Sequence, residues 1–313
     1  MPKTTRNWRY YLGNSVNDAL GYALDKLLQY DNQQSRPATA EEQQNSEQIQ
    51  GATAAVKGET RWQCVRTLTG YTSAVKSVAM SPAGQLLASG SENNRIKLWD
   101  LGTGELLRTL IGHSDRANSM VISPNGQILA SSSGYSTIDL WDLDTGELIR
   151  TLKPTWWHSR WIESITISTD GKILASGSAD STIDLWDLDT GELIRTLRDS
   201  EGVNVVAFSP TGQALISGHA DNTIKIWHSK LGHLSHTLAE HSDQVSSLAI
   251  SLDGQLLISG SLDKTIKIWD LTTQELLSTL KHSKGVSAIA LSPDGQLLAS
   301  GSLDKTIKIW QRY

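Results

Sequence analysis

Six tryptophans that recur at nearly constant spacing constrain this chain of 313 residues more than any other feature. Successive members are 42, 45, 41, 42 and 41 residues apart: Trp99, Trp141, Trp186, Trp227, Trp269 and Trp310. Longer segments recur with them, since STIDLWDLDTGELIRTL stands at 136–152 and 181–197, and SLDKTIKIW at 261–269 and 302–310. Such self-similarity indicates six copies of one supersecondary unit that stack side by side.

Each unit alternates apolar and polar residues in short runs that end at turn residues, a pattern typical of β-strands. In the fifth unit this pattern predicts four strands: VSSLAIS, QLLISGS, TIKIWDL and ELLSTL. A tight hairpin turn needs a positive φ, which glycine adopts without steric cost. A glycine stands at the first turn of every unit: Gly84, Gly126, Gly171, Gly212, Gly254 and Gly295. Four strands in about 42 residues match one blade of a β-propeller.

Composition excludes several classes of protein. No run approaches the roughly 20 apolar residues that span a bilayer, and the first residues lack the apolar core of a secretory signal. The single cysteine, Cys64, excludes an internal disulfide and a cysteine-rich metal site, so we expect a cytoplasmic protein. A net charge of -5 argues against a general nucleic-acid binder, which needs a basic face.

The repeated segments resemble the WD40 family. The resemblance rests on Gly112-His113, on SPDGQLLASGSLDKTIKIW at 292–310, and on the pairs Trp99-Asp100, Trp141-Asp142, Trp186-Asp187 and Trp269-Asp270. It covers residues 61–313 and implies an all-β, six-bladed WD40 β-propeller that serves as a platform for protein assembly. The near-identity of the units resembles the regular bacterial WD40-repeat proteins. No enzymatic activity, cofactor or metal is expected.

The two ends of the repeat region complement each other. The last unit stops at IWQRY after its third strand, whereas WQCVRTLTGY before the first unit matches the fourth strand ELLRTLIGH of a complete unit. We therefore expect the N-terminal strand to complete the last blade. Closure of this kind removes the unpaired sheet edge between the first and last blades.

Ser, His and Asp recur together in several units, which would suit a hydrolase. The resemblance implies instead a buried structural network, in which a His before the first strand, a Ser, an Asp and the Trp are hydrogen-bonded. Three sets are complete: His158, Ser176, Asp180 and Trp186; His241, Ser259, Asp263 and Trp269; and His282, Ser300, Asp304 and Trp310. Catalysis needs only one nucleophile with its base, so three copies favour the structural role, and we predict no catalytic residue.

The remaining units depart from this pattern. Tyr71 and Asn93 replace the His and Asp of the first unit, and Tyr135 replaces the Asp of the second. The fourth unit has Asp199 at the His position, opposite Asp221. We expect these blades to be less rigid, because a lost internal hydrogen bond costs roughly 0.5–1.5 kcal/mol. The two carboxylates would repel each other unless one is protonated or faces water.

The segment KPTWWHSRW at 153–161 breaks the regular spacing of the tryptophans. Its insertion lengthens the connection between two blades, which the resemblance places on the face that most often binds partners. Trp, Tyr and Arg frequently dominate binding energy, so we predict a partner-binding rim patch. Its residues are Trp156, Trp157, Arg160, Trp161, Arg116 and Tyr135. Alternatively, Trp156 and Trp157 fold back over the blade as a loop plug.

Residues 1–60 precede the repeats and divide in two. Val16, Leu20, Ala23, Leu24 and Leu27 follow helical spacing, and Ser15 with Asp18 resembles a capping box, so residues 1–30 are predicted to contain an amphipathic helix at 16–30. Residues 31–60 lack aromatic residues and are predicted to be a flexible linker. The helix could bind a partner, pair with a second copy, or dock on the propeller. Membrane contact through the basic, aromatic start of the chain is the weaker alternative.

These patterns predict a non-catalytic scaffold that binds one or more proteins. One alternative is a ligand-binding or enzymatic propeller that uses its central channel, and another is an N-terminal arm that tethers the chain to a membrane or nucleic acid. The histidines His228, His233 and His236 occupy one predicted hairpin. No cysteine or carboxylate stands at reliable ligand spacing beside them, so we interpret the hairpin as exposed and not as a metal site.

Overall fold

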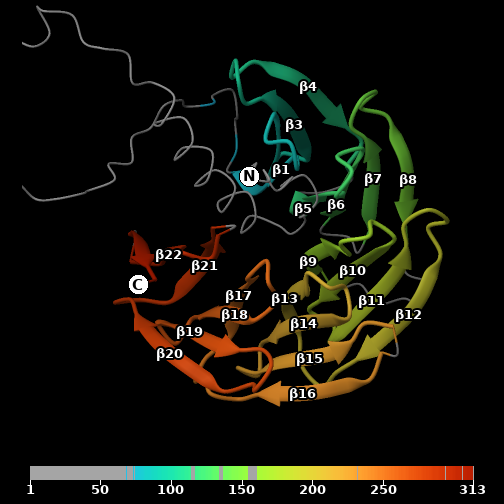
Figure 1. Cartoon of the computed structure of the whole chain (residues 1–313). Helices are drawn as coiled ribbons and strands as arrows, with labels where there is room; N and C mark the ends of the chain where they lie inside the picture. Colours follow the sequence, from blue (N-terminus) through green and yellow to red (C-terminus); the bar gives the residue numbers. More distant parts are fainter. Residues whose placement is uncertain are drawn as a thin grey trace, which may run out of the picture.

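The computed structural model describes residues 75–113, 117–133, 137–153, 161–230, 232–292, 294–304 and 306–312, together with Leu68 and Ser73. All regular elements within these ranges are β-strands, which form six antiparallel sheets. The sheets follow one another around a common centre as six blades of a β-propeller (Figure 1). The predicted all-β, six-bladed fold is therefore confirmed. The helix at 16–30, the linker at 31–60 and the closing strand lie outside the described residues.

Each blade takes its strands in chain order from the centre outward. The first three blades are β1 (Val75–Met80), β2 (Leu86–Ser91), β3 (Arg95–Asp100) and β4 (Leu106–Ile111); β5 (Ala117–Ile122), β6 (Ile128–Ser133), β7 (Ile138–Asp142) and β8 (Leu148–Leu152); and β9 (Ile162–Ile167), β10 (Ile173–Ser178), β11 (Thr182–Asp187) and β12 (Leu193–Arg198). The last three are β13 (Val203–Phe208), β14 (Ala214–His219), β15 (Ile224–His228) and β16 (Leu234–Leu238); β17 (Val245–Ile250), β18 (Leu256–Ser261), β19 (Thr265–Asp270) and β20 (Leu276–Lys281); and β21 (Val286–Leu291), β22 (Leu297–Ser302) and β23 (Ile307–Gln311).

The glycine of the first turn has the predicted conformation in every blade. Its φ lies between 65° and 75°, the left-handed region that favours glycine. In the first blade the N–H of Gly84 donates to the carbonyl of Ser81 at 2.8 Å, and the hydroxyl of Ser81 accepts a hydrogen bond from Leu86. Local turn chemistry therefore sets the register of the first hairpin.

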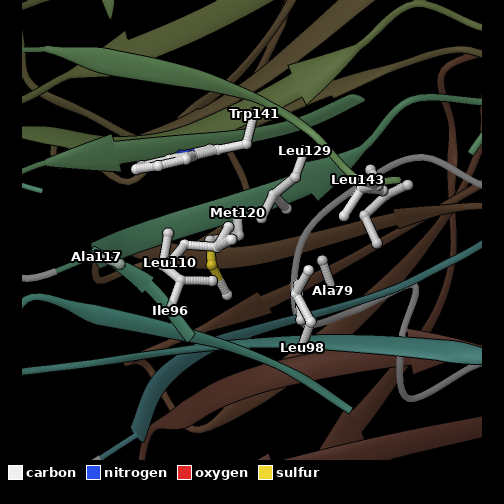
Figure 2. Close-up of a cluster of buried hydrophobic side chains, with 11 residues drawn as sticks. Ala79, Ile96, Leu98, Leu110, Ala117, Met120, Leu129, Trp141 and Leu143 are labelled. Carbon is white, nitrogen blue, oxygen red and sulfur yellow. The ribbon is translucent and has the colours of Figure 1, made fainter. Parts of the chain in front are cut away.

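Neighbouring blades share one apolar core between their facing surfaces. The cluster in Figure 2 combines Ile96 and Leu110 of the first blade with Met120 and Trp141 of the second. The contact is tight at Gly90, where a Cβ atom would lie 2.6 Å from the Cβ of Ala117. The recurring tryptophan is thus a residue of the packed boundary between blades, which explains its regular spacing.

A β-bulge occurs at the second residue of the innermost strand in all six blades, for example at Asn204 between Val203 and Val205. Asn204 donates from Nδ2 to the carbonyl of Val245 in the next blade at 3.1 Å. Ser246 donates in the same way to the carbonyl of Val286 at 2.6 Å. The bulge turns these side chains toward the following blade, so that hydrogen bonds link successive inner strands.

The boundary between the last and first blades differs from the other five. Ile307 of β23 is 71% exposed, whereas its counterparts Ile96, Ile138, Ile183, Ile224 and Ile266 are at most 1% exposed. Val75 at the start of β1 is 45% exposed, although its five counterparts are almost completely buried. The described residues therefore leave apolar surface uncovered on both sides of this boundary.

Candidate interaction surface

One face of the propeller carries the connections between blades and the turns between the second and third strand of each blade; we call it the loop face. Each described connection is held to the turn of its own blade. The N–H of Ala179 donates to the carbonyl of Trp161 at 3.1 Å, and the N–H of Leu262 donates to that of Gln244 at 3.0 Å. The end of the connection is therefore fixed where it enters the inner strand.

Trp161 lies on this face directly before β9, as the alignment of the repeats predicted. Its side chain is 51% exposed, and its carbonyl accepts a second hydrogen bond, from the Ser178 hydroxyl at 3.2 Å. A large indole is thus presented from a fixed backbone. The other predicted members of the rim patch, Trp156, Trp157, Arg160, Arg116 and Tyr135, lie outside the described residues.

The predicted hydrogen-bond network can be traced completely in the fifth blade. His241 Nδ1 lies 2.7 Å from Asp263 Oδ2, and His241 Nε2 lies 2.8 Å from Ser259 Oγ. The indole N–H of Trp269 donates to the same Ser259 oxygen at 2.9 Å. Asp263 also accepts from the backbone N–H of Ser242 at 3.1 Å. The network therefore ties the incoming connection to the turn and to the third strand.

The sixth blade repeats this arrangement. His282 lies 3.3 Å from Asp304 and 2.8 Å from Ser300, and the indole N–H of Trp310 donates to Ser300 at 2.8 Å. In the third blade Trp186 donates to Ser176 at 3.0 Å, and Asp180 accepts a hydrogen bond from Thr182. His158, the remaining member of that set, lies outside the described residues.

Burial lowers the pKa of His241, although the hydrogen bond and charge of Asp263 oppose this shift. Burial alone would raise the pKa of Asp263, but hydrogen bonds from Thr265 and His241 outweigh it and hold that pKa below its ordinary value. Ser259 is completely buried. A Ser-His-Asp arrangement that no substrate can reach, and whose serine accepts an indole hydrogen bond, favours a structural role over catalysis.

The second blade replaces its missing turn aspartate by a residue of the third strand. His113 Nε2 lies 2.6 Å from Ser131 Oγ, and His113 Nδ1 lies 3.2 Å from Asp139 Oδ2. Asp139 is 4% exposed and also accepts a hydrogen bond from the Thr151 hydroxyl at 2.7 Å. Sequence alignment missed Asp139 because four of the other five blades have lysine at this position, and the third blade, which has Asp184 there, also keeps its turn aspartate Asp180. The signal was the change from Lys97 to an acid in the second repeat.

The fourth blade supplies its histidine from within the sheet. His219, the last residue of β14, lies 2.6 Å from Ser217 and 3.3 Å from Asp199. Lys225 forms an ion pair with Asp199 and lies 3.5 Å from Asp221 Oδ2. The lysine therefore lies beside both carboxylates, and its positive charge offsets the repulsion expected from the sequence. The sequence signal was SGH at 217–219, where most other repeats have SGS.

Burial lowers the pKa of His219, while the charge of Asp199 raises it and that of Lys225 lowers it further. Desolvation raises the pKa of Asp221, but hydrogen bonds from Thr223 and the charge of Lys225 leave it below the ordinary value. The two directions favour a neutral His219 and an ionised Asp221 at neutral pH.

The histidine hairpin joins β15 to β16. The rings of His228 and His233 stack with their centroids 5.4 Å apart, and His236 Nδ1 lies 2.8 Å from the Ser235 hydroxyl. No group of three or more His, Cys, Asp or Glu side chains placed to hold a metal ion occurs among the described residues. Within those same ranges, no helix has the length and hydropathy needed to cross a membrane.

Comparison with known proteins agrees with this geometry. The family model for the WD domain, G-beta repeat, matches six segments: 62–100, 104–142, 146–187, 191–228, 232–270 and 274–311. Each of the last five matched segments begins with the outer strand of one blade and ends with the third strand of the next. The first match therefore includes residues 62–70, which precede β1.

Similar curated proteins match single repeats. Protein Mut11 of Chlamydomonas reinhardtii is 49% identical over 43 residues, 14% of this chain and 12% of that protein. Pre-mRNA-splicing factor PRP46 of Yarrowia lipolytica is 44% identical over 45 residues, which are 14% of this chain and 10% of that protein. Vegetative incompatibility protein HET-E-1 of Podospora anserina is 49% identical over 47 residues, 15% of this chain and 4% of that protein.

The aligned segments thus span only a small part of each of these relatives, whereas the family model matches most of this chain. Six matched repeats coincide with six blades of the structure. The chain belongs to the WD40-repeat family.

Proposed function

We propose that this propeller is a non-catalytic scaffold that binds a partner protein through the rim patch around Trp156, Trp157 and Trp161. The observation that carries the proposal is Trp161, which is 51% exposed although its carbonyl is held by Ala179 and Ser178. An indole on a fixed backbone loses little entropy on binding and offers a large area for contact.

Internal symmetry supports the participation of Tyr135. At Gly202, the counterpart of Trp161 in the fourth blade, a Cβ atom would lie 3.2 Å from the carbonyl oxygen of Ala179 in the preceding blade. At Gly285 in the sixth blade it would lie 3.0 Å from Leu262. The residue equivalent to Ala179 and Leu262 in the second blade is Gly134, next to Tyr135. On this equivalence, the proposal assigns Tyr135 and Trp161 to the same boundary between blades.

The buried Ser-His-Asp groups support a binding role over an enzymatic one, because their serines are engaged by tryptophan. WD40 propellers are generally interaction scaffolds, and the similarity to a splicing factor and to a vegetative incompatibility protein is compatible with such a role here. The proposed partner is a protein that covers Trp161 on the loop face.

The test compares the full chain with two variants, Trp161→Ala and Gln244→Ala. Gln244 is a matched control, because it occupies the same position in the fifth blade and its carbonyl accepts an equivalent hydrogen bond from Leu262. Proteins recovered from native lysate would be identified by mass spectrometry, and the affinity of each purified candidate would then be measured by titration.

We expect Trp161→Ala to weaken binding of a specific partner by tenfold or more, as for an interface hot spot of about 2 kcal/mol. Gln244→Ala should leave the affinity unchanged, and both variants should unfold at the wild-type temperature. A partner that binds wild type and Trp161→Ala equally would exclude this surface as the binding site.

A further inference from the structure

The outer strands of the first three blades expose a series of aliphatic side chains, which we call the aliphatic belt. Strands β4, β8 and β12 form the outer edge of three successive blades (Figure 1). The belt consists of Leu106, Leu107, Ile111, Leu148, Ile149 and Ile194, each between 45% and 75% exposed. Exposed aliphatic side chains that recur on three successive outer strands are candidates for an interaction site.

Arginine stems connect the belt between blades. The stem of Arg108 lies across Gly146 in the outer turn of the second blade, and that of Arg150 lies across Gly191 in the third. A Cβ atom at either glycine would collide with the Cδ atom of the arginine. The aliphatic stem of each arginine therefore extends from the outer strand of one blade to the outer turn of the next, between the exposed side chains of the two blades.

Exposed carboxylates border the belt along the same turns. They are Glu105, Asp144, Glu147, Asp189 and Glu192. The outer turn of the fourth blade differs, since it carries His228, Lys230 and His233 and its outer strand has Ser235 in place of an aliphatic residue. Leu234 on the outer strand of the fourth blade is also exposed, but the row formed by Leu107, Ile149 and Ile194 is interrupted there by Ser235, and the acidic border is replaced by basic and histidine side chains.

A segment of this chain outside the described residues matches the belt in two respects. The segment predicted to be helical at 16–30 has an apolar face formed by Val16, Leu20, Ala23, Leu24 and Leu27. Residues 1–30 carry four basic and two acidic side chains, and three of the basic ones, Lys3, Arg6 and Arg9, precede the helix. Apolar contact and opposite charge thus favour the same pairing.

We propose that residues 16–30 dock on the aliphatic belt of the same chain, with the basic residues 3–9 beside the acidic outer turns. The chain between residue 30 and β1 provides the connection. A flexible linker of about 30 residues has a root-mean-square span of roughly 30 Å, which suffices to reach the outer edge of a neighbouring blade. The tether also raises the effective concentration of the helix to the millimolar range, which favours the intramolecular contact.

Cross-linking in the full chain tests this docking directly. In a Cys64→Ser background, Leu24→Cys would be combined with Ile149→Cys in the belt or with Leu277→Cys, and the disulfide formed under mild oxidation would be quantified. Leu277 is the matched control. It occupies on β20 of the fifth blade the position that Ile149 occupies on β8, and its side chain is 55% exposed, compared with 50% for Ile149. We expect an intramolecular cross-link at least fivefold more abundant with Ile149 than with Leu277.

Equal cross-linking to both positions, or none, would overturn the proposal. A cross-link that appears only between two molecules, seen as a doubled mass, would assign the belt to a second copy and also overturn it. A second readout is limited proteolysis: Leu107→Asp with Ile149→Asp should speed cleavage within residues 16–30 severalfold, whereas Leu277→Asp should not.

Co-sedimentation with anionic phosphatidylserine vesicles addresses the membrane alternative. Docking predicts that the double aspartate variant binds vesicles more strongly than wild type, because the helix is released. Equal vesicle binding by both, together with unchanged proteolysis, would show that the helix is already free and would contradict docking.

Discussion

His219 Nε2 lies 2.6 Å from Ser217 Oγ, although the two residues belong to the same strand and the histidines of other blades come from the connection before the sheet. The connection in the fourth blade instead supplies Asp199, whose carboxylate faces both His219 and Lys225. The hydrogen bond to serine is thus preserved while the source of the imidazole changes. The fourth blade thus keeps an imidazole–serine hydrogen bond although its histidine occupies a different position in the repeat.

Lys225→Met should destabilise the protein by roughly 3 kcal/mol, because it leaves Asp199 largely buried beside Asp221 without a compensating cation. Chemical denaturation would measure the loss. Lys267→Met at the same position in the fifth blade is the control and should cost less, since Lys267 does not lie beside two carboxylates. Adding Asp199→Asn to Lys225→Met should recover part of the lost stability; a failure to recover any would show that the charge of Asp199 is not the cause.

Stability should fall as the pH decreases below about 6.5, because burial lowers the pKa of His219 and His241. Between the lowered pKa and the ordinary value the unfolded chain binds more protons than the folded one, so acid favours unfolding. The depressed pKa of Asp263 adds a further loss below about pH 4.

Urea midpoints at a series of pH values would measure this dependence. His241→Gln should flatten the slope between pH 7 and 5 by up to about 1.4 kcal/mol per pH unit. His236→Gln, which changes an exposed side chain, should not. Parallel curves for wild type and His241→Gln would contradict the assignment.

Gly191→Ala should cost about 1–2 kcal/mol, because its φ of 74° is strained for alanine and the new methyl group collides with the stem of Arg150. Arg150→Ala removes the collision, so the double variant should be more stable than the sum of the single effects predicts. The fifth blade has Gln274 at this position with a φ of 64°, and the preceding outer strand has His236 where Arg150 stands. Gln274→Ala should therefore be nearly neutral.

Leu68→Cys and Ile307→Cys should form a disulfide in a Cys64→Ser background if residues 62–70 close the last blade. In the first blade the equivalent residues Leu110 and Ile96 face each other across the strand pair. Applied to the last blade, that register places Leu68 opposite Ile307. The pair Leu68→Cys and Ile309→Cys is two residues out of register and should cross-link poorly; a preference for it would contradict this closure.

The sequence predicted the features that each repeat determines locally. The spacing of Trp141 and its equivalents predicted the blades, and the turn glycines such as Gly84 have the expected positive φ. Trp161 was correctly placed before the inner strand because the alignment of the repeats carries that information. These features depend on residues that are close in sequence or are repeated.

Other features depend on contacts between repeats and were missed. Asp139 and His219 complete networks from positions where a repeat alignment expects lysine or serine, so only the spatial arrangement reveals their roles. The bulge at Asn204 also has no sequence signal, since its residue type varies from blade to blade. In the second and fourth blades, departures from the consensus were thus interpreted as losses, although the structure shows replacements.

The contacts of Arg108 with Gly146 and of Arg150 with Gly191 join one blade to the next in a fixed direction. The second and third units each offer an arginine to the unit that follows and a glycine to the unit that precedes. A tandem copy inserted between two such units would meet matching surfaces on both sides. The number of blades can therefore change by whole units without new interfaces having to arise, and the near-identical second and third repeats are what recent growth by this route would leave behind.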